Sequence, residues 1–199
     1  RNAEQYGVSL NKMQVIYPAV FNQNIQSNTH CEFNESLSKI KIISIGRCHW
    51  KKNYTAALDA MLILQKCGVS FHYKIIAHGK DKENILYQIN DLGLTNNVTF
   101  INGLPHESLM VELKNSQLFL LPSVEEGISN AVLEAMASCV PVITTDCGGM
   151  TEVINDGENG FIIPRWNPGA IADAIRAYIE MNRGAKQLLI SNALNSINE

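Results

Sequence analysis

Two glutamates, eight residues apart, flank the start of a predicted helix. The stretch SVEEGISNAVLEAMAS places Glu126 in a loop and Glu134 in the second turn of the helix that follows. Ser129 or Asn130 is suited to cap that helix, and Gly127 lets the backbone approach a ligand closely. Free amides and the helix dipole at such a start favour a phosphate or pyrophosphate. The two carboxylates would then flank an anion site, separated along the helix axis by at most about 12 Å.

That separation is about the span between the ribose and the sugar of a nucleotide diphosphate sugar. Carboxylates accept hydrogen bonds from neighbouring hydroxyl groups, so each glutamate is suited to hold one sugar ring while the amides between them hold phosphate. The alternative stays open that Glu126 is a solvated loop residue and Glu134 an exposed helix position. Glu125 has no partner at the matching spacing, and we expect it on the surface.

Two basic residues follow the first predicted strand, in the segment GRCHWKKN. Arg47 offers a planar fork of donors and Lys52 a point charge, and both suit phosphate oxygens. The alternative is that Lys51 and Lys52 are ordinary surface lysines and that Arg47 pairs with a nearby carboxylate. His49 and Trp50 are expected in structural or surface roles.

A third loop, TDCGGMTE, has two adjacent glycines that permit close approach of the backbone to a ligand, although a plain turn between strand and helix uses them too. Asp146 and Glu152 are expected to cap or complement helix ends. Neither a G-x-G-x-x-G segment after a strand nor a G-x-x-x-x-G-K-[ST] segment is present, which disfavours a dinucleotide dehydrogenase and a P-loop NTPase.

Short β-branched runs alternate with longer segments of helical period from residue 39 onward, as in a parallel sheet with crossover helices. The runs are apolar on both faces, which is typical of strands buried between two helical layers. We therefore predict an α/β, doubly wound parallel sheet of Rossmann-like type, whose ligand binds at the carboxyl ends of the strands. The predicted strands are 41–44, 73–77, 98–101, 118–122, 141–145 and 160–164. The predicted helices are 53–66, 82–92, 107–114, 129–138, 150–155, 168–181 and 185–197.

The first part of the chain does not show this alternation of strands and helices. Residues 1–38 are expected to form a linker with one short strand at 13–18, and residues 39–199 the nucleotide-sugar-binding domain. Five scattered cysteines without a C-x-x-C pair favour reduced thiols over a disulfide framework or a zinc site.

Composition excludes several classes of function. The chain has 199 residues, 46% of them hydrophobic, which is enough for one domain with a substantial core. A net charge of −3 without a basic run argues against binding to nucleic acid or to a membrane through a polybasic patch. No apolar stretch approaches the roughly 20 residues that span a bilayer, and the start of the chain lacks a signal-peptide layout.

Taken in order, these loops resemble the donor-binding half of retaining glycosyltransferases with the GT-B fold, specifically glycosyltransferase family 4. The family's E-x7-E element matches Glu126 and Glu134, and its G-R-x4-K element matches Gly46, Arg47 and Lys52. A further element of the family matches Phe100, Asn102 and Gly103, and the resemblance covers about residues 13–182.

The resemblance implies a role for each matched residue. Arg47 and Lys52 would bind the donor diphosphate, with Glu126 at the transferred sugar and Glu134 at the ribose. The backbone of the helix start would hold sugar and phosphate, and the base would lie near the turn after the third strand. The resemblance thus names as catalytic Glu126, Arg47 and Lys52, and as substrate-binding Gly46, Arg47, Lys52, Gly103, Leu104, Glu126, Gly127, Ile128, Ser129, Asn130 and Glu134.

The reaction implied is transfer of a sugar from a nucleotide diphosphate sugar to a saccharide or glycoconjugate, with retention at the anomeric carbon. No metal and no cofactor are expected, since the two basic residues and the helix start would stabilise the charge. The acceptor-binding domain is expected to be absent from this chain, so the domain alone should bind donor weakly and transfer little. The resemblance further implies a cytoplasmic location, peripheral to the membrane in some members.

Two other functions remain open from the sequence. One is a GT-B relative such as a nucleotide-sugar epimerase or a phosphorylase, although Arg47 with Lys52 and the E-x7-E element fit the transferases better. The other is a non-catalytic module that binds a nucleotide sugar and has lost turnover.

Overall fold

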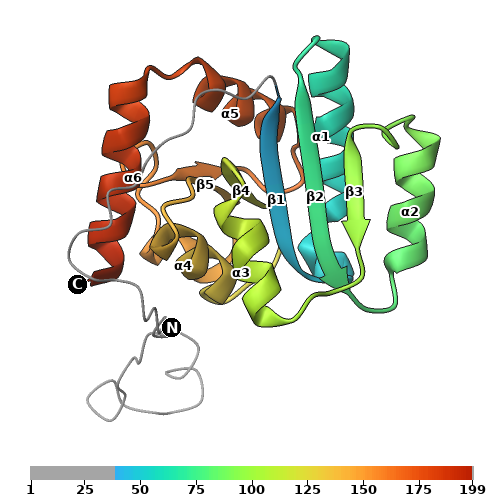
Figure 1. Ribbon diagram of the computed structural model, residues 1–199, viewed down its shortest axis with the longest axis horizontal. Helices are drawn as coiled ribbons and strands as arrows, with labels where there is room; N and C mark the ends of the chain where they lie inside the picture. The colour runs from blue at the N-terminus through green and yellow to red at the C-terminus, as the bar shows by residue number, and fades with distance from the viewer. Residues whose placement is uncertain (1–38, 199) are drawn as a thin grey trace, which may run out of the picture.

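The computed structural model describes residues 39–198, which form a parallel sheet covered by helices on both faces (Figure 1). The order of its strands is β3-β2-β1-β4-β5-β6, and every neighbouring pair is parallel. The strands are β1 (Ile40–Arg47), β2 (Phe71–His78), β3 (Val98–Ile101), β4 (Leu118–Leu121), β5 (Val142–Thr145) and β6 (Phe161–Ile163).

Two hydrophobic cores lie on opposite faces of the sheet because successive side chains of a strand point to opposite sides. Ile42 belongs to one core and its neighbour Ile43 to the other, and both are fully buried. One core is covered by α1 (Tyr54–Lys66), α2 (Lys82–Asp91) and α5 (Pro168–Glu180). The other is covered by α3 (His106–Lys114), α4 (Asn130–Ala137) and α6 (Arg183–Asn198). The apolar runs of the sequence are therefore confirmed as strands buried between two helical layers.

The strand order reverses between β1 and β4. From β1 the chain adds β2 and β3 on one side, and it then crosses to the other side of β1 to add β4, β5 and β6. In open α/β sheets a ligand binds outside the carboxyl ends of the strands at such a reversal. The loops after β1 and β4 flank that point, and the loop after β5 lies next to it. The topology thus brings together the three loops that the sequence marked for chemistry.

Most element bounds lie within two residues of the sequence prediction, but β1 continues to Arg47, three residues beyond the predicted 41–44. Two further differences lie in the loops. The helix predicted at 150–155 is instead the 3₁₀ turn η4 (Gly148–Glu152), which begins with Gly148 in a left-handed conformation at φ 55°. The chain also makes an unpredicted 3₁₀ turn, η3 (Trp50–Lys52), and Asn53 follows it with φ 50° before α1 begins. Short 3₁₀ turns have no hydrophobic periodicity, so the pattern of apolar residues does not reveal them.

The predicted linker 1–38, with its short strand at 13–18, lies outside the described residues. Among the described cysteines, Cys48, Cys67 and Cys147 are free.

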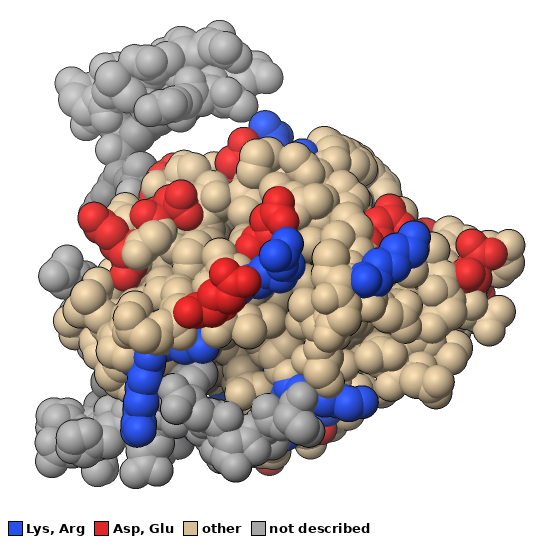
Figure 2. Space-filling view, turned by 90° about the horizontal axis from the view of Figure 1, so that it is seen from above, with Lys and Arg blue, Asp and Glu red and all other residues tan. Residues whose placement is uncertain are grey.

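Acidic and basic side chains are interspersed on the face shown in Figure 2, and neither sign gathers into one large patch there. This agrees with the mixed composition, although it concerns that face alone. Within residues 39–198, none of the helices combines the length and the apolar character needed to cross a membrane.

Candidate functional site

The loops after β1 and β4 meet through an ion pair. Lys52 Nζ lies 2.5 Å from Glu126 Oε2, and the two side chains keep only 14% and 22% of their surface exposed. Ser123 Oγ also donates to Glu126 Oε2, at 3.3 Å. The sequence analysis assigned Lys52 to the phosphate and Glu126 to the sugar, and it did not predict that the two side chains contact each other.

Hydrogen bonds to backbone carbonyls hold the β4 loop against η3 and against the end of β5. The amide of Val124 donates to the carbonyl of Lys51 at 2.8 Å, which joins the β4 loop to η3. The hydroxyl of Thr145 donates to the carbonyl of Ser123, which joins it to β5. The carboxylate of Glu126 is therefore presented by a loop that is fixed from both sides.

Gly148 is required by this arrangement. A Cβ atom there would lie 1.5 Å from the carbonyl oxygen of Glu126, a distance that no side chain can occupy. A Cβ at Gly149 would lie 2.9 Å from Ile128 Cγ1. The sequence predicted that these glycines permit close approach of the backbone; what approaches in the structure is the β4 loop itself.

Gly46 makes room for two side chains at the end of β1. A Cβ there would lie 3.0 Å from Tyr54 Oη and 3.1 Å from Lys52 Cε. Tyr54 is buried, and its hydroxyl has no hydrogen-bond partner among the described residues. Burial is the main cause that raises the pKa of Tyr54 well above its ordinary value, and the nearby Glu126 carboxylate adds to it. The uncharged side chain of Tyr54 thus packs beside the Lys52–Glu126 pair. The sequence analysis did not identify this residue.

Arg47 is the last residue of β1 and is exposed. Within residues 39–198, no carboxylate lies within ion-pair distance of it, so the alternative that Arg47 is held by a nearby carboxylate is not realised there. Its guanidinium remains available at the carboxyl edge of the sheet.

The predicted helix start is present. Ser129 is the N-cap of α4, and its side chain makes no capping hydrogen bond, so it leaves the amides of the first turn to other partners. Gly127 is exposed, Ile128 is half-buried, and Asn130 is the first residue of the helix. The helix therefore starts where the sequence predicted, and an anion site at its first amides stays a prediction.

Glu134 lies in the second turn of α4, with 22% of its side chain exposed. Burial raises the pKa of Glu134, and His106 partly opposes that rise, with its Nδ1 at 4.0 Å from Glu134 Oε1. His106 opens α3 directly after the turn that contains Gly103, at φ 72°, and Leu104. The structure thus brings Glu134 next to the turn after β3, two elements that the resemblance assigned to one nucleoside. His106 itself was missed, because a lone histidine in a polar turn carries no spacing signal.

No group of three or more His, Cys, Asp or Glu side chains able to hold a metal ion occurs within the described range. Basic side chains and helix amides are the groups at this edge that suit an anionic ligand.

The family model for "Glycosyl transferases group 1" matches residues 26–195. The chain belongs to the group 1 glycosyl transferases. Among curated relatives in this group, the amylovoran biosynthesis glycosyltransferase AmsK of Erwinia amylovora is 30% identical over 163 residues. That match covers 79% of this chain and 38% of AmsK, so the chain spans well under half the length of that relative.

Solved structures agree with this fold. Anabaena Alr3699/HepE, determined in complex with UDP and glucose, superposes with a TM-score of 0.73 at 21% identity, covering 80% of this chain and 44% of that one. The C-terminal domain of the group 1 family protein LpcC from Francisella tularensis superposes with a TM-score of 0.70 at 22% identity. That match covers 80% of this chain and 84% of the LpcC domain. The α/β, Rossmann-like fold predicted from sequence is confirmed.

Proposed function

We propose that this chain is the donor-binding domain of a retaining glycosyltransferase of family 4 that uses a nucleotide diphosphate sugar. The observation that carries the proposal is the Lys52–Glu126 contact at the point where the strand order reverses, directly before the start of α4. A cation, a carboxylate and a helix start at one edge suit a ligand that joins a diphosphate to a sugar. The acceptor-binding domain, in this proposal, lies outside the sequence.

The donor lies along the edge of the sheet. Arg47 and Lys52 hold the diphosphate together with the first amides of α4. Glu126 accepts hydrogen bonds from the sugar hydroxyls, and Glu134 accepts them from the ribose hydroxyls. The half-buried position of Glu134 beside the turn after β3 supports this, since the base then reaches Gly103 and Leu104.

Lys52 serves two partners in this arrangement. Its ammonium group has three donors, and the contact with Glu126 uses one of them. The remaining donors point to phosphate oxygens while Glu126 stays oriented toward the sugar. The ion pair therefore fixes the distance between the diphosphate and the transferred sugar before the donor binds.

In the reaction, the bond between the anomeric carbon and the phosphate oxygen breaks, and a bond to the acceptor oxygen forms on the same face. The acceptor hydroxyl gives its proton to the departing phosphate oxygen. Arg47 and Lys52 stabilise the charge that develops on the diphosphate, without a metal ion or another cofactor. The names of the relatives suggest the acceptor: AmsK is an amylovoran biosynthesis enzyme, which supports a role in polysaccharide assembly.

The test is a calorimetric titration of the 199-residue chain with a panel of nucleotide diphosphate sugars, beginning with UDP-glucose because HepE was solved with UDP and glucose. We expect one donor to bind more tightly than the others. Arg47→Ala and Glu134→Ala should each weaken it by about tenfold or more, because each removes at least one charged hydrogen bond.

Glu125→Ala is the matched control, since Glu125 is adjacent to Glu126 but its side chain is largely exposed and pairs with Lys51. It should leave donor affinity unchanged. Equal affinity of the wild type and both site variants for every donor would overturn the proposed site. For the whole enzyme, a product with inverted anomeric configuration in its initial NMR spectrum would overturn retention.

A further inference from the structure

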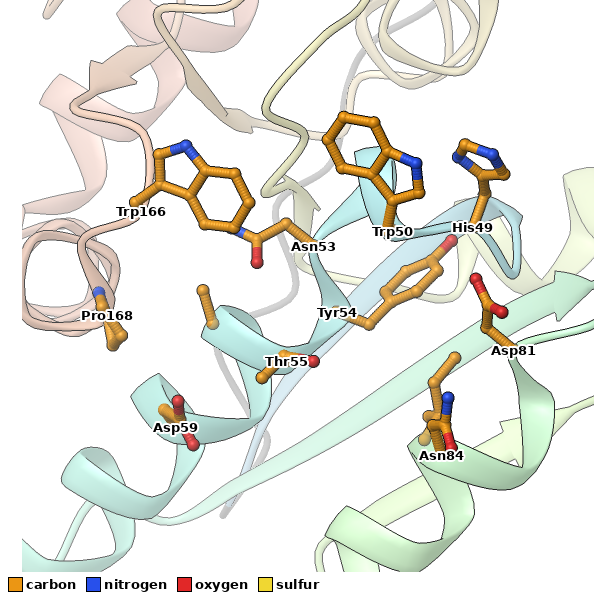
Figure 3. Close-up of a pocket in the computed structure, with 12 residues that line it drawn as sticks. His49, Trp50, Asn53, Tyr54, Thr55, Asp59, Asp81, Asn84, Trp166 and Pro168 are labelled. Carbon is orange, nitrogen blue, oxygen red and sulfur yellow. The ribbon is translucent and has the colours of Figure 1, made fainter.

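A pocket separate from the Lys52–Glu126 pair opens beside the N-terminus of α1. Its volume is about 380 Å³, within the range of small-molecule sites. It lies among η3, the first turns of α1 and α2, and the segment that leads into α5 (Figure 3). Neither Lys52, Glu126 nor Glu134 lines it. We call it the tryptophan pocket, after Trp50 and Trp166; its polar lining includes Asn53, Asp59, Asp81 and Asn84.

Both tryptophans are exposed at this pocket. Trp50 keeps 57% of its surface in solvent and Trp166 keeps 64%, although each has a large ring that packing would otherwise bury. Figure 3 draws the two indole rings at the same end of the pocket, above the start of α1. Lys51 Nζ lies over one face of Trp50, 5.7 Å from the ring centroid, so the exposed ring of Trp166 and the remaining surface of Trp50 favour a ligand that stacks on rings.

Trp166 is held in a conformation that its side chain disfavours. Its φ is 59°, in the left-handed region, which is strained for a bulky residue. Its neighbours on both sides are anchored: Arg165 Nε lies 3.0 Å from Asp146 Oδ1, and Asn167 Oδ1 accepts from the amide of Ala170 at 2.9 Å. The backbone therefore fixes this ring at the rim of the pocket instead of letting it relax.

The polar lining is acidic. Asp81 is the N-cap of α2 but makes no capping hydrogen bond with its side chain, and Asp59 receives one bond from Gln88, at 3.0 Å. Among the residues that line the pocket, none is Lys or Arg. Two carboxylates without a cation repel phosphate and carboxylate ligands, and they accept hydrogen bonds from hydroxyl groups.

Asn53 supplies a further group. Only 6% of this residue is exposed, and its side-chain nitrogen has no hydrogen-bond partner among the described residues. A buried donor without a partner is unfavourable, so an acceptor oxygen from a ligand in the pocket that reached it would be stabilising.

Open aromatic rings, carboxylates that accept from hydroxyls, and an amide donor are together the groups that recognise a sugar ring. The apolar face of the ring stacks on an indole, and its hydroxyls bond to the acidic and amide groups. We propose that the tryptophan pocket is a second carbohydrate site, which binds an uncharged saccharide unit of a glycan. This inference does not depend on the proposed donor site, because none of the residues assigned to the donor lines the pocket. Tyr54 adjoins both places and is assigned no contact with either ligand.

The experiment uses the intrinsic tryptophan fluorescence of the 199-residue chain, whose two tryptophans, Trp50 and Trp166, both line this pocket. The chain is titrated with neutral oligosaccharides of glucose, galactose and mannose. We expect a saturable change with at least one of them, unaffected by excess UDP. Trp166→Gly should weaken this binding by tenfold or more while leaving the chain folded, because glycine adopts a positive φ without strain.

Binding of the Trp166→Gly variant is followed through Trp50 and by calorimetry, and its affinity for a nucleotide diphosphate sugar should equal that of the wild type. Lys66→Ala, at the far end of α1 and outside the pocket lining, should keep saccharide binding. A flat titration with every neutral oligosaccharide would overturn the proposal. A blue shift with neutral phosphatidylcholine vesicles and none with saccharides would also overturn it, by assigning the tryptophans to a membrane surface.

Discussion

Two ion pairs join the same two loops, one residue apart, and they differ in exposure. Lys52 and Glu126 lie 2.5 Å apart with side chains 14% and 22% exposed. Lys51 and Glu125 lie 2.7 Å apart with side chains 39% and 62% exposed. The sequence offers the same chemistry twice, as KK in one loop and EE in the other, and the fold places only one copy in a half-buried site.

The difference matters because the strength of a charge interaction depends on the solvent around it. An exposed pair is screened by water and salt, whereas a partly buried pair is screened less and costs more to break. The inner pair, Lys52–Glu126, is therefore suited to orient a ligand. The outer pair, Lys51–Glu125, remains largely in contact with solvent. Variants of the two pairs and of their surroundings separate these roles.

The largest effect is expected from Gly148→Ala, which removes the support shared by both pairs. The new Cβ would meet the carbonyl oxygen of Glu126 at 1.5 Å, and the residue would keep a φ of 55°. We expect the free energy of unfolding to fall by about 3 kcal/mol or more, because backbone atoms must move. Urea denaturation measures it. Gly127→Ala is the control, since a Cβ there meets nothing within 4 Å, and equal stability of the two variants would contradict this account.

A double-mutant cycle on each pair tests the comparison directly. Lys52→Met should lower the free energy of unfolding by about 1–3 kcal/mol, because it leaves Glu126 half-buried without its cation. The coupling energy between Lys52 and Glu126, from Lys52→Met, Glu126→Gln and the double variant, should exceed that of Lys51 and Glu125. It should also persist in 0.5 M NaCl, on the order of the concentration at which surface pairs are screened. Equal coupling energies would remove the distinction between inner and outer pair.

Glu134→Gln sharpens the comparison at the other end of the site. Burial raises the pKa of Glu134 above its ordinary value of 4.5, so the folded chain binds that proton more tightly than the unfolded chain does. The contribution of Glu134 to stability therefore falls as pH rises from below 4.5 through the raised pKa. At pH 7 the glutamine variant should be more stable than the wild type, and this advantage should vanish at pH 4.

The same variant should bind the proposed donor about tenfold more weakly, because a neutral amide is a poorer acceptor for ribose hydroxyls. Thermal unfolding at the two pH values and calorimetric titration measure the two effects. Glu107→Gln, on the exposed side of α3, is the control for both. A Glu134→Gln variant that loses stability at pH 7 would show that the carboxylate is stabilised by a partner instead of strained by burial.

Much of the fold follows from the sequence because its signals are local. The strand runs are apolar on both faces, and glycines such as Gly68 and Gly93 mark the ends of helices, where both have positive φ. Those signals placed the helices and strands and hence the edge where the loops meet. Turns without periodicity, η3 and η4, were not predicted, since their geometry follows from packing between loops distant in sequence.

The candidate site was predictable only in part. Sequence spacing identified Glu126, Glu134 and Lys52, but the contact between Lys52 and Glu126 spans 74 positions of sequence and depends on the strand order. Tyr54 and Trp166 had no motif to mark them. Trp166 was recognised as a candidate binding residue only from its positive φ and its exposure, which are properties of the folded chain.

The smallest effect is expected at the outer pair, and it decides whether proximity alone explains the inner one. Lys51→Met and Glu125→Gln should each change the free energy of unfolding by no more than about 0.5 kcal/mol, because exposed pairs contribute little after screening and loss of side-chain freedom. The amide of Val124 would still bond to the carbonyl of Lys51, so the loops stay joined through the backbone. Urea denaturation at low and high salt measures the change. A loss at Lys51 as large as that at Lys52 would mean that the pairs act as one network, and the inner pair would then have no separate role in orienting a ligand.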